Sequence, residues 1–494
     1  MPWSIGRRAA SPNVLLSACL FILAFPNFNL AEAAWLALVP LVLLVRREHR
    51  LKNAFFHGWL SGTLAYGGIL YWLLPTFHAA QLSPFLGVAA LLALSAYLGL
   101  FWGVWTWWLM FSRHAKQHLL LGAAGWVVLE YLRTYLFSGF PWALFGDSQI
   151  HRLPLIQVAS ITGVYGISFL LVWGNLVFAE ALLNKRRALR PFGAALAVVL
   201  TFGAITLKLP DTRGPEFKIA LLQGNIDQYK KWNEVYVAEI KQTYETLAER
   251  AAASGAQLII WPETSVPGYL IQDHPLRLWL TKVILKSGTA HLVGAPYLQA
   301  DKAYNAAFAL SPVGFIQGVY GKQHLVPFGE TVPLQAVLGR WISVLNALGG
   351  FTAGNESPVL KSAGVPIGIN ICYEAIFPNL VRRSVKLGAQ VIVNITNDGW
   401  YMKTAAPYQH LAPNIFRAVE NRRWLLRADN TGVSAIIDPW GRIIAQTPIY
   451  QTRILAGSAR LRSDLTFYSR YGDFFAWLCI LAVSLYARRR DQMM

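Results

Sequence analysis

Residues 365–374 have the sequence Val-Pro-Ile-Gly-Ile-Asn-Ile-Cys-Tyr-Glu, and the fold prediction starts from this stretch. A short apolar run of this kind predicts a buried β-strand, which here ends abruptly at Cys372. Proline is favoured in the first turn of a helix, so a helix is expected to begin near Phe377 and Pro378. A cysteine at such a corner lies beside backbone N–H groups that favour its reactive thiolate form. A lone cysteine is more often a small buried core residue, so Cys372 needs support from other parts of the chain.

Two other predicted strands also end in a side chain suited to catalysis. The apolar run at residues 256–264 ends in Glu263, and the run at residues 318–330 leads to Lys322 and then turns. A thiol needs a base to take its proton, and the oxyanion formed during acyl transfer needs a fixed positive charge. Glu263, Lys322 and Cys372 therefore offer a base, a cation and a nucleophile at three strand ends.

The composition indicates a membrane protein. Of the 494 residues, 55% are hydrophobic and 14% are charged, and 19 are tryptophan. The formal net charge of +19 would suit nucleic acid or anionic lipid, and the large apolar fraction favours lipid. The three cysteines, Cys19, Cys372 and Cys479, do not suggest a disulfide framework, because the outer two lie in apolar runs.

Apolar runs predict about eight membrane spans, with seven before residue 208 and one at the C-terminal end. The first run resembles a signal peptide, but the long runs that follow it favour a span. The second and last runs are short against the ~20 residues that a spanning helix needs, so their flanks must contribute. The predicted domains are a seven-span domain at 1–208, a catalytic domain at 215–463 and a final transmembrane helix at 471–488. The runs are 14–25, 34–45, 54–74, 85–111, 119–137, 156–183, 192–207 and 474–486.

Lysine and arginine cluster in alternate loops between these runs. Short loops rich in these residues stay in the cytoplasm, and the intervening loops at 26–32 and 75–84 contain neither. The pattern places both termini in the cytoplasm and the segment 208–470 on the opposite face of the membrane. The clusters are Arg46, Arg47, Arg50 and Lys52; Arg113 and Lys116; Lys185, Arg186, Arg187 and Arg190; and Arg488, Arg489 and Arg490.

Two further features of the chain leave alternatives open. Glu130 and Arg133 lie inside a predicted span, where they either neutralise each other one turn apart or mark a functional site. Residues 332–351 carry Trp341 and Leu345 at helix-face spacing. This segment is either an amphipathic arm over the active site that dips into lipid, or a surface helix packed on its own domain.

The segment outside the membrane alternates predicted strands with predicted helices, which is typical of an α/β domain. The expected strands are 217–225, 257–261, 291–297, 304–310, 315–320, 367–371, 391–395 and 433–437. The expected helices are 234–254, 275–287, 379–387 and 407–428.

The order of Glu263, Lys322 and Cys372 along the chain resembles the catalytic triad of the nitrilase, or carbon–nitrogen hydrolase, superfamily. The resemblance implies that Glu263 is the general base, Lys322 the oxyanion stabiliser and Cys372 the nucleophile. It also implies a four-layer α-β-β-α sandwich, which the pattern of strands and helices alone does not establish. A helical transmembrane bundle joined to such a sandwich is therefore the expected fold class.

Nearly the whole chain resembles the apolipoprotein N-acyltransferase family, bacterial inner-membrane enzymes that add the third acyl chain to lipoproteins. In that family the positions matching Trp232, Glu330, Tyr373 and Glu374 are also needed for activity. Trp232 taken alone fits a core aromatic residue equally well, and Glu330 an ordinary ion-pair partner. The matching motifs are Gln223-Gly224-Asn225, Lys231-Trp232, residues 261–264, Tyr304-Asn305, residues 322–330, residues 372–374 and Asn397-Asp398-Gly399-Trp400.

This resemblance implies the substrates and the location. A phospholipid, with phosphatidylethanolamine as the family's usual donor, would acylate Cys372 as a thioester, and a diacylated apolipoprotein would accept the acyl chain. The implied enzyme is a monomer of the bacterial inner membrane with its catalytic domain in the periplasm, without metal, cofactor or nucleic acid. The alternatives are a membrane-tethered amidase or nitrilase with a small polar substrate, and a membrane module without catalysis.

Overall fold

A computed structural model describes residues 11–208, 211, 214–231, 233–331 and 350–492. The chain divides into two compact units. The helical unit comprises Met1–Lys208, Thr404–Gln409 and Asp473–Met494, and the α/β unit comprises Leu209–Lys403 and His410–Gly472. We describe each unit by itself.

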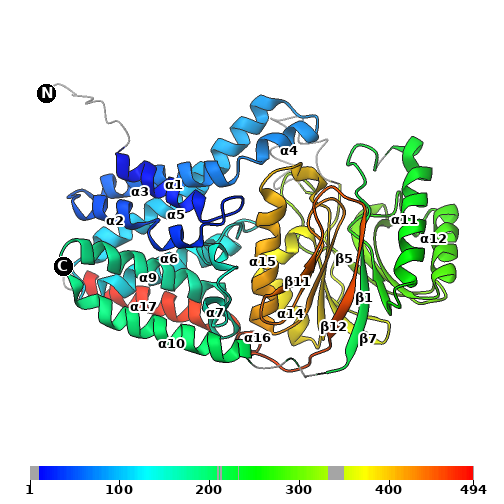
Figure 1. The fold of residues 1–494 in the computed structure, drawn as a ribbon. Helices are drawn as coiled ribbons and strands as arrows, with labels where there is room; N and C mark the ends of the chain where they lie inside the picture. Colours follow the sequence, from blue (N-terminus) through cyan, green and yellow to red (C-terminus); the bar gives the residue numbers. More distant parts are fainter. Residues whose placement is uncertain (1–10, 209–210, 212–213, 232, 332–349, 493–494) are drawn as a thin grey trace. The chain divides into compact units, whose positions relative to one another are not determined.

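The helical unit contains helices at all the apolar runs of the sequence (Figure 1). Among the described residues, Pro84–Ser112, Val164–Leu182 and Arg186–Lys208 are long and apolar enough to cross a membrane. These three helices do not account for the predicted number of about eight spans. The helices of this unit are α1 (Pro12–Leu23), α2 (Val39–Arg46), α3 (Leu51–Ile69), α4 (Leu73–Ala79), α5 (Pro84–Ser112), α6 (His118–Tyr135), α7 (Leu153–Ile156), α8 (Ala159–Thr162), α9 (Val164–Leu182), α10 (Leu189–Lys208) and α17 (Phe474–Asp491).

The apolar run at 156–183 is not one continuous helix. Helix α8 ends at Thr162, and α9 begins at Val164. Between them Gly163 has a φ of +66°, which glycine adopts without the steric cost that a side chain would impose. The long apolar run is therefore divided by a backbone turn that hydrophobicity alone does not reveal.

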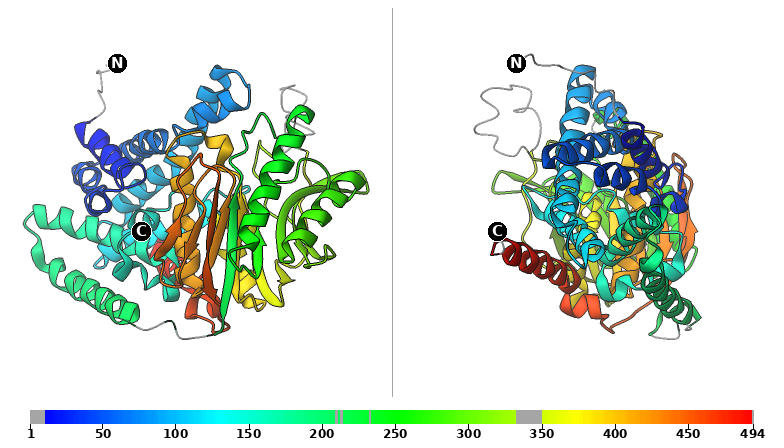
Figure 2. Two further views of the ribbon diagram at one scale, coloured as in Figure 1. Left: turned by 45° about the vertical axis from the view of Figure 1, so that its right-hand side comes forward. Right: turned by 90° about the vertical axis from the view of Figure 1, so that its left-hand side faces the viewer.

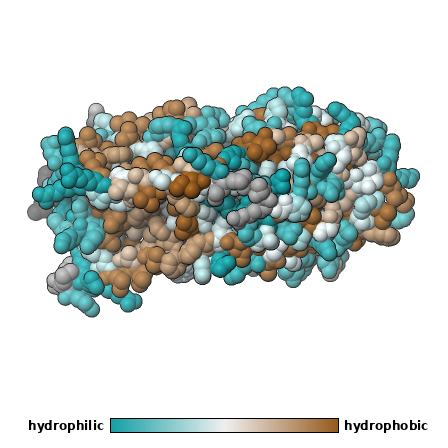
Figure 3. All heavy atoms as spheres, turned by 60° about the horizontal axis from the view of Figure 1, so that its bottom comes forward, coloured by the Kyte–Doolittle hydropathy of each residue, from teal (hydrophilic) through white to brown (hydrophobic). Residues whose placement is uncertain are grey.

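The outer surface of the helical unit is strongly apolar. Val198 and Ile205 of α10 are 69% and 60% exposed, and Trp477 of α17 is 57% exposed. Figure 3 shows hydrophobic residues gathered on one face of this unit. Apolar side chains exposed on long helices are stable where lipid replaces water, which agrees with a membrane protein.

The two charged residues of α6 have separate partners. The guanidinium of Arg133 donates a hydrogen bond to the hydroxyl of Tyr66, and Glu130 Oε1 accepts one from the backbone N–H of Phe145 at 2.7 Å. The structure records no ion pair between Glu130 and Arg133, both of which it describes. The two side chains nevertheless interact electrostatically, so both predicted alternatives, mutual neutralisation and a functional site, stay open.

The α/β unit contains two six-stranded sheets with helices over their outer faces (Figures 1 and 2). The first sheet has the order β12-β1-β2-β3-β4-β5 and the second β11-β10-β9-β8-β7-β6. Parallel strands lie at the centre of each sheet and antiparallel strands at its edges. The strands are β1 (Glu216–Gln223), β2 (Leu258–Ile260), β3 (Ala290–Gln299), β4 (Lys302–Leu310), β5 (Ile316–Gly321), β6 (Val359–Ser362), β7 (Val365–Ile371), β8 (Val391–Thr396), β9 (Leu425–Asp429), β10 (Ala435–Ile437), β11 (Ile443–Gln446) and β12 (Arg453–Arg460).

The helices pack on the sheets through apolar faces. On the first sheet, α11 (Val237–Ala252) and α12 (His274–Ser287) form one buried core with the strands, in which Tyr244 stacks on Trp261 with ring centroids 4.8 Å apart. Helix α14 (Pro378–Lys386) contacts β7 of the second sheet, and α15 (Ala406–Asn421) lies beside α14 (Figure 1). The structure thus has the α-β-β-α layering that the nitrilase resemblance implied.

One predicted helix was too long. The helix expected at 407–428 ends at Asn421, because Arg422 takes a left-handed φ of +48° and the buried strand β9 follows. The sequence analysis also missed strands β6, β11 and β12. These strands lie at or beside sheet edges and lack the continuous apolar run that marks a central strand.

Gly294 of β3 allows the turn that carries Glu263 to approach the sheet. A Cβ atom built at Gly294 would lie 2.1 Å from the carbonyl oxygen of Pro262 and 2.8 Å from Cα of Glu263. The carbonyl of Gly294 also accepts a hydrogen bond from the N–H of Ser265 at 2.8 Å. Only glycine fits this close backbone contact.

We therefore expect Gly294→Ala to displace this turn and to lower the free energy of unfolding by ~1–3 kcal/mol, as for overpacked cores. The midpoint of thermal unfolding of the purified protein measures the effect. Gly318→Ala is the matched control, because its Cβ would meet only Cδ2 of Leu360, at 3.2 Å and at the end of a flexible side chain. Equal midpoints for the two variants would contradict the steric argument.

Candidate active site

The structure brings the three predicted catalytic residues to one buried place. Glu263 follows β2 and Lys322 follows β5, both in the first sheet, whereas Cys372 follows β7 in the second sheet. The Nζ of Lys322 lies 3.3 Å from Oε1 of Glu263. Cys372 interacts electrostatically with both of these residues. The base and the cation therefore come from one sheet and the thiol from the other.

Cys372 lies at the strand-to-helix corner that the sequence predicted. Strand β7 ends at Ile371, a 3₁₀ turn covers Cys372–Ile376, and α14 begins at Pro378. Cys372 has a φ of +52°, which is a left-handed conformation that a residue with a side chain rarely adopts. Such local strain is typical of functional positions, where the surrounding structure enforces it.

The surroundings of Cys372 favour the protonated thiol. Burial raises the pKa of the Cys372 thiol and the nearby Glu263 raises it further, while Lys322 counteracts part of the increase. The net direction is opposite to the expectation that the turn and its cations favour the thiolate, although Lys322 acts as expected. Nucleophilic attack by such a thiol needs a base, and Glu263, the predicted base, is one of the charged groups that act on Cys372.

A second carboxylate holds the lysine. The Nζ of Lys322 lies 2.9 Å from Oε1 and 2.8 Å from Oε2 of Glu330. Burial lowers the pKa of Lys322, but Glu263 and Glu330 outweigh this and leave it well above its ordinary value. The Nδ2 of Asn305 donates to Oε1 of Glu263 at 2.7 Å and to Oε1 of Glu330 at 3.0 Å. Lys322 is thus a permanent cation held between two carboxylates.

Glu374 joins the cysteine turn to the lysine turn. Its Oε1 accepts hydrogen bonds from the Tyr320 hydroxyl at 2.9 Å and from the N–H groups of Gln323 and His324 at 2.7 and 3.0 Å. Its Oε2 accepts one from the N–H of Ile371 at 2.7 Å. The Glu374 side chain therefore holds the residue before the nucleophile against the segment that follows Lys322.

Tyr373 is buried beside the nucleophile. Its ring packs against Phe377 with centroids 5.2 Å apart and against His324 at 5.9 Å, and burial raises the pKa of its hydroxyl. Of the other predicted residues, Trp232 lies outside the described residues. Most of the predicted amphipathic arm, residues 332–349, also lies outside them.

Sequence reasoning did not assign a role to a charged network beneath the cysteine. Arg427 donates to Asp398 at 2.7 Å, to Asp429 at 3.1 Å and to Asn394 at 2.6 Å. Asn394 in turn donates to the carbonyl of Cys372 at 3.4 Å. Burial and the neighbouring Asp398 raise the pKa of Asp429 to about 7. Arg427 and Asp429 belong to β9, a strand that was predicted as helix.

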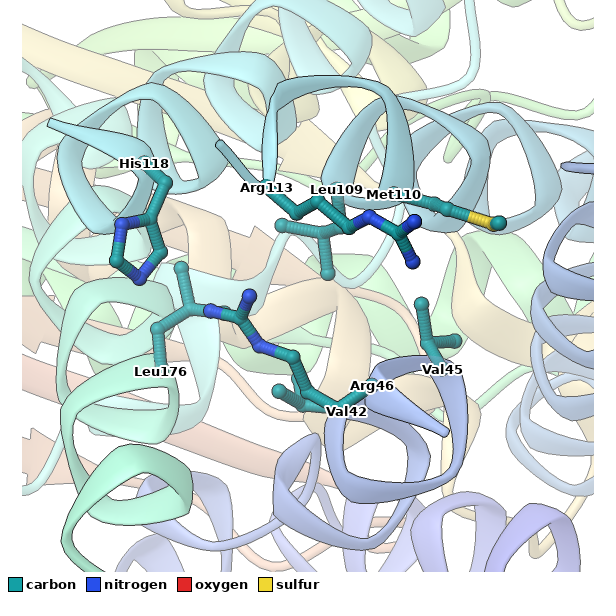
Figure 4. A pocket seen from close by; sticks show the side chains of 8 residues that line it. All are labelled: Val42, Val45, Arg46, Leu109, Met110, Arg113, His118 and Leu176. Atoms are coloured by element: carbon teal, nitrogen blue, oxygen red, sulfur yellow. The ribbon is translucent and has the colours of Figure 1, made fainter. Parts of the chain in front are cut away.

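A cavity in the helical unit is lined by other residues. Figure 4 shows Arg46, Arg113 and His118 lining that cavity together with apolar side chains, and Arg46 pairs there with Glu180 at 2.5 Å. None of the predicted catalytic residues lines it. Among the described residues, no group of His, Cys, Asp and Glu is arranged to hold a metal ion.

Two family models match separate parts of the chain. The family model for carbon–nitrogen hydrolases matches residues 218–459, and the model for the apolipoprotein N-acyltransferase N-terminal domain matches residues 17–177. Among solved structures, an amidase from Nesterenkonia sp. is 22% identical, with a TM-score of 0.40, and the match covers 52% of this chain and 94% of that one.

Curated relatives match almost the full length. The apolipoprotein N-acyltransferase of Geobacter metallireducens is 39% identical over 96% of this chain and 94% of its own. That of Methylococcus capsulatus is 36% identical over 96% of this chain and 95% of its own. The α/β unit thus has the carbon–nitrogen hydrolase fold. The whole chain belongs to the apolipoprotein N-acyltransferase family, and it is an acyltransferase.

A substitution at Glu374 tests whether its hydrogen bonds hold the Cys372 turn against the segment after Lys322. In Glu374→Gln one oxygen of the side chain becomes an NH₂ group that faces an N–H donor, which leaves a buried group unsatisfied at a cost of ~1–3 kcal/mol. We expect a lower unfolding midpoint and weaker acyl transfer. Glu239→Gln, at an exposed position of α11, is the control. Wild-type activity of Glu374→Gln would show that the cysteine turn does not depend on this clamp.

Proposed function

We propose that this chain transfers an acyl chain from a phospholipid to the N-terminal amine of the diacylglyceryl-cysteine of an apolipoprotein. The observation that carries the proposal is the convergence of Glu263, Lys322 and Cys372 in one buried site. The names of the full-length relatives and the apolar outer surface of the helical unit support a lipid substrate. Phosphatidylethanolamine is the proposed donor.

The first half-reaction forms a thioester. Glu263 takes the proton of Cys372, and the sulfur attacks the carbonyl carbon of the sn-1 ester of the phospholipid. Lys322 and the backbone N–H of Tyr373 stabilise the oxyanion, and losing one such donor typically slows acyl transfer by ~10²–10³-fold. When the bond to the glycerol oxygen breaks, protonated Glu263 gives its proton to that oxygen. A lysophospholipid leaves, and the acyl chain remains on Cys372.

The second half-reaction moves the acyl chain to nitrogen. The free α-amine of the acceptor attacks the thioester carbon, Glu263 takes a proton from the amine, and the Cys372 sulfur leaves and is reprotonated. An amide is the product. The burial of the site favours this outcome, because water that reached the thioester would release a fatty acid instead.

The finer organisation is also part of the proposal. We infer about eight membrane spans in the bacterial inner membrane, with a seven-span domain at 1–208 and a C-terminal span at 471–488. The catalytic domain at 215–463 lies on the periplasmic side, and the enzyme acts as a monomer. Supporting roles for Trp232, Glu330, Tyr373 and Glu374 follow from the family resemblance. For Glu330 and Glu374, the hydrogen bonds described above also support them.

Intact mass spectrometry after incubation with phospholipid tests the thioester. The wild-type protein should gain one acyl group, and Cys372→Ala should gain none while remaining folded. Glu263→Gln and Lys322→Arg should acylate far more slowly, because the first lacks a base and the second lacks the compact ammonium group. Release of free acid or ammonia without transfer to an amine would instead indicate a hydrolase. Acylation of Cys372→Ala would exclude this residue as the nucleophile.

A reporter fusion tests the topology. A reporter placed after Leu183 should lie in the cytoplasm, and one near Asp301 should lie in the periplasm, because the basic loops remain on the cytoplasmic side. Protease protection or a compartment-specific enzyme reporter distinguishes the two locations. Both reporters on the same side would contradict the proposed number of spans.

A further inference from the structure

A second lysine is buried beside the proposed base. Lys231 lies in the segment between β1 and α11 and is only 4% exposed. Its Nζ donates a hydrogen bond to the main-chain carbonyl of Glu263 at 2.9 Å. The side chain of the neighbouring Lys230 is partly exposed instead of buried, and its Nζ lies 2.9 Å from Oε1 of the exposed Glu239. Neither lysine takes part in the mechanism described above.

The charged groups that interact with Lys231 belong to the active site. They are Glu263 after β2, Asp429 of β9 and Cys372 after β7. Burial lowers the pKa of Lys231 to about 8, although these three groups act in the opposite direction. Lys231 is therefore mainly an ammonium ion at neutral pH, and it loses its proton as the pH rises through about 8.

A neutral side chain could hold the Glu263 carbonyl at lower cost. Burying an ammonium group costs several kcal/mol unless neighbouring negative charge compensates for it. The Glu263 carbonyl is neutral, so this hydrogen bond alone does not account for a charged residue at the position. Attraction between two groups is mutual, so an ammonium that a Cys372 thiolate stabilises also stabilises that thiolate.

We propose that Lys231 is a positioning residue for the acylation step. Its N–H fixes the main chain of Glu263, and its positive charge stabilises the negative charge that passes from Glu263 to the Cys372 sulfur during proton transfer. The proposal rests on the function proposed above. Lys322 remains the cation at the oxyanion, and Lys231 acts through Glu263 and Cys372 without contacting the acyl donor.

Two substitutions separate the hydrogen bond from the charge. Lys231→Met removes both, whereas Lys231→Gln keeps an N–H donor and removes only the charge. We expect both variants to acylate more slowly by up to about tenfold. A loss of thiolate stabilisation that raises the pKa of the thiol by one unit corresponds to a factor of ten. The KM for phospholipid should stay unchanged, and Lys230→Met should behave as the wild type.

The pH profile gives a readout that a purely structural role would not change. The wild-type acylation rate should fall as the pH rises through about 8, because Lys231 then loses its charge. This alkaline fall should be absent from Lys231→Met and Lys231→Gln. Asp429, whose pKa lies at about 7, and Cys372 are present in every variant, so their presence alone does not account for an alkaline fall that only the wild type shows.

The rate of acylation is measured by intact mass with phosphatidylethanolamine vesicles and, separately, with p-nitrophenyl butyrate. The second substrate needs no lipid site. If p-nitrophenyl butyrate acylates the protein and phosphatidylethanolamine does not, the proposed lipid donor is wrong. The variants of Lys231 can still be compared with p-nitrophenyl butyrate in that case. If Lys231→Gln acylates at the wild-type rate, the charge of Lys231 has no role in acylation and the proposal is wrong. If the Met and Gln variants do not fold, the wild-type profile decides, and a rate that does not fall between pH 7 and 9 overturns the proposal.

Discussion

The ion pair network around Lys322 is the interaction on which the site depends. A single buried ammonium lies between Glu263 and Glu330, and the amide of Asn305 spans the same two carboxylates. Without this cation, two carboxylates would face each other in a low-dielectric interior, where one of them would take up a proton. Lys322 therefore keeps its positive charge in the buried site and compensates the two carboxylates that flank it.

The second constraint is the separation of the reacting groups between two sheets. Glu263 and Lys322 end strands of the first sheet, whereas Cys372 ends a strand of the second. Their relative position depends on how the sheets pack, and the four hydrogen bonds accepted by Glu374 tie the two turns together. Glu374 therefore fixes the geometry between the two turns, on which reactions between groups from different sheets depend.

The sequence predicted those parts of the fold that local patterns encode. Central strands such as β7 and β8 are continuous apolar runs, and their bounds were close to those observed. Edge strands such as β11 and β12 are polar and half exposed, so only pairing with a distant segment makes them strands. Most of strand β9 was predicted as helix. The amino-acid composition gives no sign that Arg422, before this strand, takes a left-handed conformation that ends the helix.

By itself, the sequence determined that a glutamate, a lysine and a cysteine each end a strand, and that long apolar helices accompany them. It could also determine the family, because the motifs lie in one order along the chain. Only the tertiary structure decided which charges meet. Burial and Glu263 raise the pKa of the Cys372 thiol by more than Lys322 lowers it, and Lys231 is buried against the main chain of Glu263 instead of lying in water. Desolvation and distance set these charges, and both are properties of packed neighbours that are remote in the sequence.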